Sequence, residues 1–298
     1  MYASYNICLF SYLLFRKFDA ICAIDLDTIL PCLLVSKIKN RPRVYDAHEL
    51  FCEMKEVVSR PSRYRFWKRI ERYAVPQFKF GYTVNEAIAD AFNKMYSVKY
   101  EVIRSIALWR GENNDAGRGK YILYQGAVNE GRSFESLIPA MNYINMPMVI
   151  CGTGNYYEQA CRLTRDLQLQ DKIDFRGDVL PDNMRMITNR AAVGITLFEN
   201  KGMSNYLSLA NRFFDYVHAG VPQLCSDFPC YREINEKYEV AVLITDLSAQ
   251  NIAETINDLL SDTERWQRLH NNCIAAAKEL SWQQESKKLI SFYKNILG

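Results

Sequence analysis

The sequence predicts an α/β protein of two domains, each built on a doubly wound parallel sheet. Short apolar runs rich in β-branched and aromatic residues alternate with helical patterns, which is typical of parallel strands joined by helices. The alternation stops over Leu108 to Lys120 and resumes at Tyr121. The chain has 298 residues, of which 49% are hydrophobic, so it can bury two ordinary cores.

The first predicted domain, residues 1–107, opens with the apolar run Ile7 to Phe15. This run is shorter than the roughly 20 apolar residues of a membrane span and lacks the features of a signal peptide, so we expect a buried helix. Strands and helices then alternate: strands over Asp19 to Ile24, Arg43 to Ala47 and Phe78 to Val84, and helices over Thr28 to Lys39, Ser62 to Ala74 and Glu86 to Met95.

Residues 108–120 are rich in glycine, asparagine and charge, a composition that predicts a linker. The second predicted domain, residues 121–281, has six strands with helices between them: Tyr121 to Gln125, Met148 to Cys151, Lys172 to Phe175, Val193 to Leu197, Pro222 to Ser226 and Val240 to Ile244. Turns with glycine or small polar residues follow many of these strands, and parallel sheets bind ligands at such strand ends.

Charge and cysteine content exclude several classes of protein. Lys and Arg total 37 against 34 for Asp and Glu, so no overall basic field indicates a nucleic-acid partner. The nine cysteines are scattered without metal-ligand spacing, which favours a reduced, cytoplasmic protein.

The segment from Asn205 to Pro222 has the strongest functional pattern. On a helix, Asn211 and Asp215 lie one turn apart on the same side. A helix N-terminus near Ser204 and Asn205 would direct free amides and the positive end of the dipole at a diphosphate. The alternative is a solvated Asp on an amphipathic surface helix, but the exit through Gly220 and Pro222 into a buried strand favours a site.

This segment resembles glycosyltransferases of the GT-B fold, especially the large retaining family 4, and the resemblance covers nearly the whole chain. The family has two glutamates separated by seven residues here, whereas this sequence has Leu207 and Asp215. The resemblance implies that Asp215 accepts hydrogen bonds from the ribose of a nucleotide-sugar donor. The contact with the donor sugar would then come from Asn205, Tyr206, Ser208 or backbone amides.

The resemblance also assigns donor-binding roles elsewhere in the second domain. Arg132, after Gly131, resembles the family's basic residue, and a guanidinium can hold two phosphate oxygens and stabilise the leaving diphosphate. The alternative is an exposed Arg in a first helical turn. Further donor-binding candidates are the loop glycines and the segment expected to line the nucleobase pocket: Gly126, Gly152, Gly154, Arg176 and Val179.

In the first domain, His48 ends a predicted buried strand where the family has a pocket histidine near the reacting sugar. We take His48 and Arg132 as the catalytic candidates. Asp25, His48 and Glu49 are the acceptor-side candidates, with Glu49 or Glu53 orienting the imidazole. The alternative for His48 is a satisfied structural histidine.

The stretch from Arg60 to Lys79 interleaves basic and aromatic residues. Basic amphipathic helices of this kind dock on anionic lipid surfaces, so we expect contact with the inner face of a membrane. The alternative is a helix with one buried aromatic face and one solvated basic face.

The resemblance implies a GT-B fold of two Rossmann-type domains facing a cleft, with residues 282–298 forming a helix that returns to the first domain. The first domain lacks the family's usual opening βα units, so we expect a fragment or a reduced domain. The implied reaction is sugar transfer to a glycan or lipid-linked acceptor, with retention and without metal or cofactor. A non-catalytic nucleotide-sugar binder is the main alternative; a nucleotide-sugar epimerase and a dinucleotide enzyme fit less well.

Overall fold

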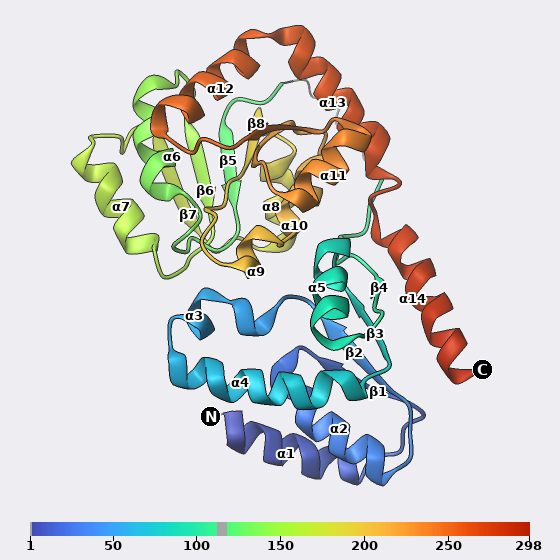
Figure 1. The fold of residues 1–298 in the computed structure, drawn as a ribbon. Helices are drawn as coiled ribbons and strands as arrows, with labels where there is room; N and C mark the ends of the chain where they lie inside the picture. Colours follow the sequence, from blue (N-terminus) through green and yellow to red (C-terminus); the bar gives the residue numbers. More distant parts are fainter. Residues whose placement is uncertain (1, 112–117) are drawn as a thin grey trace. The chain divides into compact units, whose positions relative to one another are not determined.

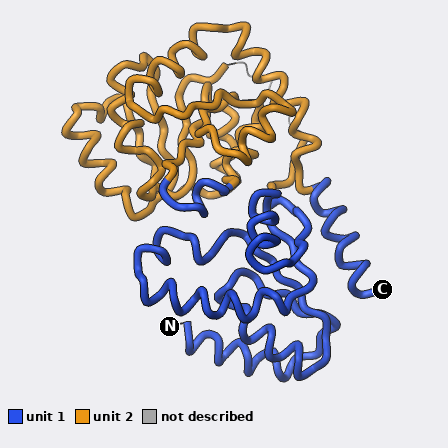
Figure 2. Tube along the Cα trace, viewed as in Figure 1, with its two compact units in different colours: residues 1–105, 201–208, 283–298 blue, residues 106–200, 209–282 orange. Residues whose placement is uncertain are grey.

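The computed structural model describes residues 2–111 and 118–298, so residues 112–117 of the predicted linker lie outside the described part. The chain divides into two compact units (Figure 2). Unit 1 comprises Met1–Ser105, Lys201–Ser208 and Gln283–Gly298, and unit 2 comprises Ile106–Asn200 and Leu209–Trp282. The segment 201–208, predicted within residues 121–281, thus packs with unit 1, where Asn85 Nδ2 donates to the Leu207 carbonyl oxygen at 2.8 Å.

Unit 1 has a four-stranded parallel sheet in the order β1-β2-β3-β4. Its strands are β1 (Ile21–Ile24), β2 (Arg43–Ala47), β3 (Phe80–Thr83) and β4 (Glu101–Val102). The first three lie inside the predicted strands. The sequence did not predict β4, because two residues are too few to form a recognisable alternation.

Helices cover both faces of this sheet. Tyr45 packs on Phe92 of α5 (Glu86–Tyr96), with ring centroids 5.9 Å apart. Tyr82 on the neighbouring strand points to the other face, because it is in register with Asp46 rather than with Tyr45. There it packs at 5.3 Å against Phe292 of α14 (Trp282–Leu297). The remaining connections are η1 (Leu26–Thr28), α2 (Ile29–Ile38), η2 (Phe51–Glu53), α3 (Lys55–Val58), α4 (Pro61–Ala74) and η3 (Val75–Gln77).

Helix α1 (Tyr2–Leu14) forms where the first apolar run predicts a helix, but the expectation that it is buried is wrong. The helix runs beside α2 in an outer layer (Figure 1) and has no buried residue. Its apolar side chains are spread around the helix, so packing on α2 leaves many of them in solvent. Among the described residues, no helix is long and apolar enough to cross a membrane.

Unit 2 has a six-stranded parallel sheet in the order β10-β9-β8-β5-β6-β7. The strands are β5 (Ile122–Gln125), β6 (Met148–Cys151), β7 (Ile173–Gly177), β8 (Val193–Thr196), β9 (Gln223–Ser226) and β10 (Ala241–Ile244), all at predicted positions. The chain builds outward from β5 to β7 and then returns to place β8 on the other side of β5. The strand order therefore reverses between β5 and β8, where doubly wound sheets bind ligands.

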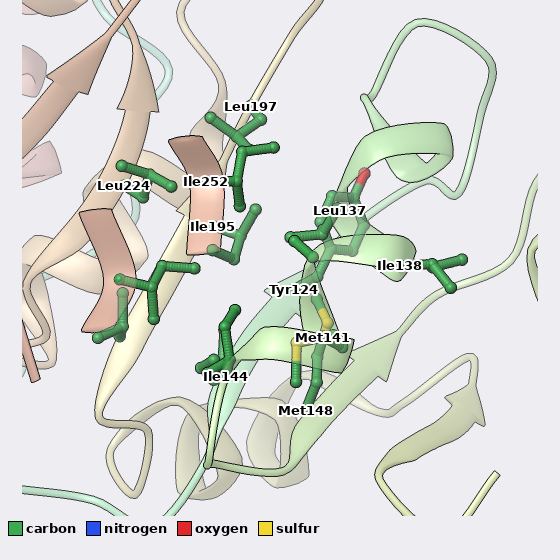
Figure 3. Close-up of a cluster of buried hydrophobic side chains, with 14 of the residues drawn as sticks. Tyr124, Leu137, Ile138, Met141, Ile144, Met148, Ile195, Leu197, Leu224 and Ile252 are labelled. Carbon is green, nitrogen blue, oxygen red and sulfur yellow. The ribbon is translucent and has the colours of Figure 1, made fainter. Parts of the chain in front are cut away.

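The core of unit 2 lies on both faces of its sheet. On one face, side chains such as Tyr124, Ile195 and Leu224 pack against α6 (Phe134–Ala140) and α12 (Ala249–Ser261) (Figure 3). On the other face, Leu123 and Tyr216 pack near α8 (Pro181–Thr188) and α10 (Asn211–His218). The remaining helices are η4 (Met141–Tyr143), α7 (Tyr157–Asp166), α9 (Met203–Tyr206), α11 (Pro229–Tyr238) and α13 (Thr263–Ala277).

The predicted helix start near Ser204 and Asn205 is wrong for the helix that carries Asp215. Helix α9 ends at Tyr206, and α10 begins at Asn211 after an extended Ala210 with φ −74° and ψ 136°. Between them, the Ser208 hydroxyl donates to the Asn205 carbonyl oxygen at 2.8 Å, a local bond of the kind that competes with continued helix. The helix N-terminus that belongs to unit 2 is therefore at Asn211.

Candidate functional site

Unit 2 contains a pocket of about 680 Å³ where β5, β6 and β7 end and α10 begins. This is the position at which the reversal of strand order predicts ligand binding. Five of the predicted donor residues lie in its wall: Gly126, Gly152, Val179, Asn211 and Asp215. The other lining residues are Gln125, Ala127, Cys151, Thr153, Asp178, Met184, Ala210 and Arg212.

The two pocket glycines bring the loops after β5 and β6 into direct contact. Gly152 has a φ of 127°, and a Cβ added to it would lie 2.0 Å from the Gly126 carbonyl oxygen. Gly126 has a φ of 116°, and a Cβ there would lie 2.9 Å from Arg212 Nη1. Only residues without a Cβ fit this arrangement, so the pocket wall here is backbone that a ligand can approach closely.

Asp215 projects from α10 and is held by a chain of polar side chains. Gln125 Nε2 donates to Asp215 Oδ2 at 2.8 Å, and Gln125 Oε1 accepts from the Thr188 hydroxyl at 2.7 Å. Burial raises the pKa of Asp215 to about 6, while the Gln125 hydrogen bond and the charge of Arg212 oppose this shift. The carboxylate is thus oriented but poorly hydrated, which favours hydrogen bonding to ligand hydroxyl groups.

Arg212 is a pocket residue that the sequence did not identify. Its side chain is buried, and its guanidinium lies over the rings of Tyr124 and Phe198 at 4.6 and 4.8 Å. Nη1 donates to the Tyr124 hydroxyl at 3.1 Å and to the Gln125 carbonyl oxygen at 3.0 Å. The available signal was an Arg in a helix turn whose other residues are apolar.

Several predicted donor residues lie outside the lining of this pocket. Arg132 packs over the Phe198 ring at 4.1 Å, Gly131 precedes it, and Gly154 lies beside the Val128 carbonyl oxygen. Arg176 pairs with Asp174 at 2.8 Å and lines a neighbouring pocket with Val179. Asn205, Tyr206 and Ser208 belong to unit 1.

A second polar cluster lies at the carboxyl ends of β1 and β2 in unit 1. His48 Nε2 is 3.1 Å from Asp46 Oδ1, and the Tyr82 hydroxyl donates to Asp46 Oδ2 at 3.1 Å. The His48 amide donates to Asp25 Oδ1 at 2.9 Å. Asp25 has a φ of 54°, a left-handed conformation that is uncommon for residues other than glycine. The structure therefore brings together Asp25 and His48, two of the three acceptor-side candidates.

The expected partner of the His48 imidazole requires correction. Asp46, which the sequence did not identify, is the carboxylate that contacts the ring, and its hydrogen bond raises the pKa of His48. Glu53 instead lies 3.3 Å from Lys68 Nζ, and Glu49 is only a minor influence on the His48 pKa. Burial raises the pKa of Asp25.

Metal ligation has no evident geometry in the part of the chain that the structure describes. No group of three or more His, Cys, Asp or Glu side chains there could hold an ion.

Two parallel-sheet units, with a ligand pocket at the reversal of strand order in unit 2, define a protein of the GT-B glycosyltransferase fold. The sequence matches the model of the family "Glycosyl transferases group 1" over residues 105–280, more than half of the chain. The protein belongs to this family. A comparison with curated proteins gives no match.

Solved structures with the same fold include three glycosyl-transfer proteins. HepE of Anabaena in complex with UDP is 14% identical, with 97% of this chain and 82% of that chain covered and a TM-score of 0.74. A glycosyltransferase of Rickettsia africae ESF-5 is 12% identical, with 99% and 81% covered and a TM-score of 0.77. Sucrose-phosphate synthase of Thermosynechococcus elongatus is 15% identical, with 98% and 77% covered and a TM-score of 0.76.

Proposed function

We propose that this family member is an active glycosyltransferase that binds a nucleotide sugar in the unit 2 pocket. The observation that carries the proposal is Asp215, a buried and oriented carboxylate in a backbone-lined pocket at the reversal of strand order. We assign to Asp215 the two ribose hydroxyls of the donor, since a fixed carboxylate accepts two hydrogen bonds. HepE with bound UDP and UDP-glucose supports the choice of a nucleotide-sugar donor.

The reaction we propose is transfer to a glycan or lipid-linked acceptor with retention, as in family 4. The bond between the anomeric carbon and the phosphate oxygen breaks, and the acceptor oxygen bonds to the same face of that carbon. The acceptor proton passes to the departing phosphate. The protein contributes positioning and charge stabilisation to this step, without metal.

The cluster in unit 1 suits a role beside the reacting sugar. The His48 side chain is 44% exposed, and its Nε2 is engaged by Asp46. We propose that Asp46 holds the imidazole and favours its protonated form, so that the ring can donate a hydrogen bond to a substrate oxygen. Asp25 would fix the backbone of His48 and offer an acceptor for hydroxyl groups.

A second candidate is a nucleotide-sugar-binding protein without transferase activity. Leu207 occupies the position of the family's first acid, and it packs against the hydrophobic core of unit 1. A buried leucine cannot contact a sugar by hydrogen bonding, so this subsite depends on other groups. Nucleotide turnover separates this candidate from the enzyme.

We also propose that α4 docks on an anionic bilayer. Phe66 and Tyr73 are exposed beside the exposed cations Arg65, Arg69 and Arg72, a pattern that suits insertion among acidic headgroups. Lys68 does not join this surface, because it lies 2.6 Å from the buried Glu71. Flotation with phosphatidylglycerol vesicles should carry the wild type but not Phe66→Glu, and failure of the wild type to float would contradict the proposal.

Binding of nucleoside diphosphates tests the donor site. A panel with all common bases, titrated calorimetrically, should identify at least one that binds the wild type. Asp215→Ala should weaken that binding by about 10- to 100-fold, because it removes hydrogen bonds to a charged acceptor. Asp258→Ala, on the exposed surface of α12, is the matched control. Equal affinities for Asp215→Ala and the wild type would contradict the assignment.

A further inference from the structure

Arg212 carries a buried positive charge that the protein itself does not neutralise. Its side chain is 8% exposed, and its Nε and Nη2 atoms have no hydrogen-bond partner among the described residues. No carboxylate of the described chain lies within ion-pair distance of the guanidinium, which stays charged in proteins. A buried, unpaired charge is strongly unfavourable, so this arrangement needs a reason.

The position of Arg212 on its helix adds to this electrostatic cost. Helix α10 has eight residues and begins at Asn211, so Arg212 lies in its first turn. The N-cap residue Ala210 offers no side-chain acceptor, and the first turn has no acidic residue. A cation at a helix N-terminus is repelled by the positive end of the dipole. The start of α10 and the guanidinium therefore contribute charge of the same sign to one pocket wall.

Neighbouring groups fix the guanidinium at that wall. The Tyr124 and Phe198 rings lie 4.6 and 4.8 Å from it, and two hydrogen bonds hold Nη1 beside Gly126. The side chain therefore cannot extend into bulk water to hydrate its charge, as long cationic side chains usually do. An anion in the pocket would relieve both the unpaired charge and the unfavourable helix end.

We propose that Arg212 and the N-terminus of α10 form the diphosphate subsite of this pocket. The inference rests on the proposed function and assigns the ligand chemistry of this subsite as a pyrophosphate group. It moves the main cation from Arg132, which the sequence favoured, to a residue that lines the pocket. The same charge would stabilise the diphosphate as the sugar departs.

Calorimetric titration of the full chain with inorganic pyrophosphate tests the subsite without knowledge of the base or sugar. The wild type should bind it, and Arg212→Met should bind about 10- to 100-fold more weakly, as expected for lost charge-assisted hydrogen bonds. Arg212→Lys keeps the charge without the planar fork and should fall between them. Arg162→Met, on the exposed surface of α7, controls for the loss of one positive charge.

A second comparison uses the nucleoside diphosphate that the wild type binds most tightly, together with its nucleoside. Arg212→Met should lose affinity for the diphosphate and keep that for the nucleoside. Equal loss for both ligands would indicate a general packing role and would overturn the inference, as would unchanged pyrophosphate and diphosphate binding. If pyrophosphate binding depends on Arg212 but no nucleotide binds, the subsite stands and the proposed donor specificity fails. Thermal unfolding of each variant verifies folding, and Arg212→Lys carries the test if Arg212→Met does not fold.

Discussion

Gln125 and Asp215 come from different elements of unit 2 and are joined by a 2.8 Å hydrogen bond from Nε2 to Oδ2. Gln125 ends β5, whereas Asp215 lies on α10. The bond links the strand at which the sheet reverses its order to the helix that borders the pocket. It orients a carboxylate whose pKa burial raises to about 6.

Nucleoside binding should weaken as the pH falls through 6. The folded protein binds the Asp215 proton more tightly than the unfolded chain, so ionisation of Asp215 costs stability above about pH 6. Binding has the opposite dependence, because the ionised carboxylate is the better acceptor for ribose hydroxyls. Affinity for a nucleoside, which lacks the titrating phosphates, should fall about tenfold per pH unit below 6.

Calorimetry between pH 5 and 8 measures this dependence, and Asp215→Asn is the control because its side chain does not titrate. Its affinity should be low and independent of pH. A wild-type profile as flat as that of Asp215→Asn would contradict the role of the carboxylate.

Asp46→Asn should lower the pKa of His48. The hydrogen bond to Asp46 is the main reason that this pKa lies above its ordinary value, and an amide provides no comparable stabilisation of the imidazolium. NMR titration can follow the ring directly, since the chain has only 3 histidines. Asp90→Asn, on the exposed side of α5, should leave the titration unchanged. A His48 pKa that does not change in Asp46→Asn would show that the contact at 3.1 Å has little energetic effect.

Gly152→Ala should destabilise unit 2 and distort the pocket. The new Cβ would lie 2.0 Å from the Gly126 carbonyl oxygen at a φ of 127°, so backbone must move. We expect a loss of about 3 kcal/mol or more in the free energy of unfolding. Gly177→Ala also has a positive φ, 61°, but its nearest contact is 4.0 Å away, so it should cost only about 1 kcal/mol. Equal losses in urea denaturation would refute the close approach of the two loops.

Lys68→Met should be among the most destabilising single changes in unit 1. It leaves Glu71, which is 1% exposed, without the ammonium group 2.6 Å away, and the expected cost is about 3 to 5 kcal/mol. The double variant Lys68→Met/Glu71→Leu should recover at least half of that loss, since it removes the stranded charge. A double variant less stable than Lys68→Met would contradict this explanation.

Much of the fold was predictable, because buried parallel strands are short apolar runs between turns. The runs that became β5 and β6, for example, are almost wholly apolar. The break before α10 was not predictable, because the residues on both sides favour helix and Leu207 is held by tertiary contacts in unit 1. The burial of α1 was wrongly predicted, since apolar composition alone does not show how much of a helix its neighbours cover.

The candidate site was predictable where chemistry follows strand ends, as with Gly126, Gly152 and Asp215. Arg212 was missed because an arginine on an amphipathic helix is usually solvated, and only the structure shows its side chain between two aromatic rings. Asp46 was missed because it lies within a strand rather than after one. A charged residue inside a buried strand was nevertheless a usable signal.

Nucleotide release from a panel of nucleotide sugars is the most direct measurement of the proposed transferase activity. The assay follows liberation of free nucleoside diphosphate by the wild type, by Asp215→Ala and by the surface control Asp258→Ala. Release from at least one donor, at equal rates for the wild type and the control and greatly reduced in Asp215→Ala, is the predicted result. Donor binding without nucleotide release, with or without glycan and lipid-linked acceptors, would contradict the enzyme and favour the non-catalytic binder.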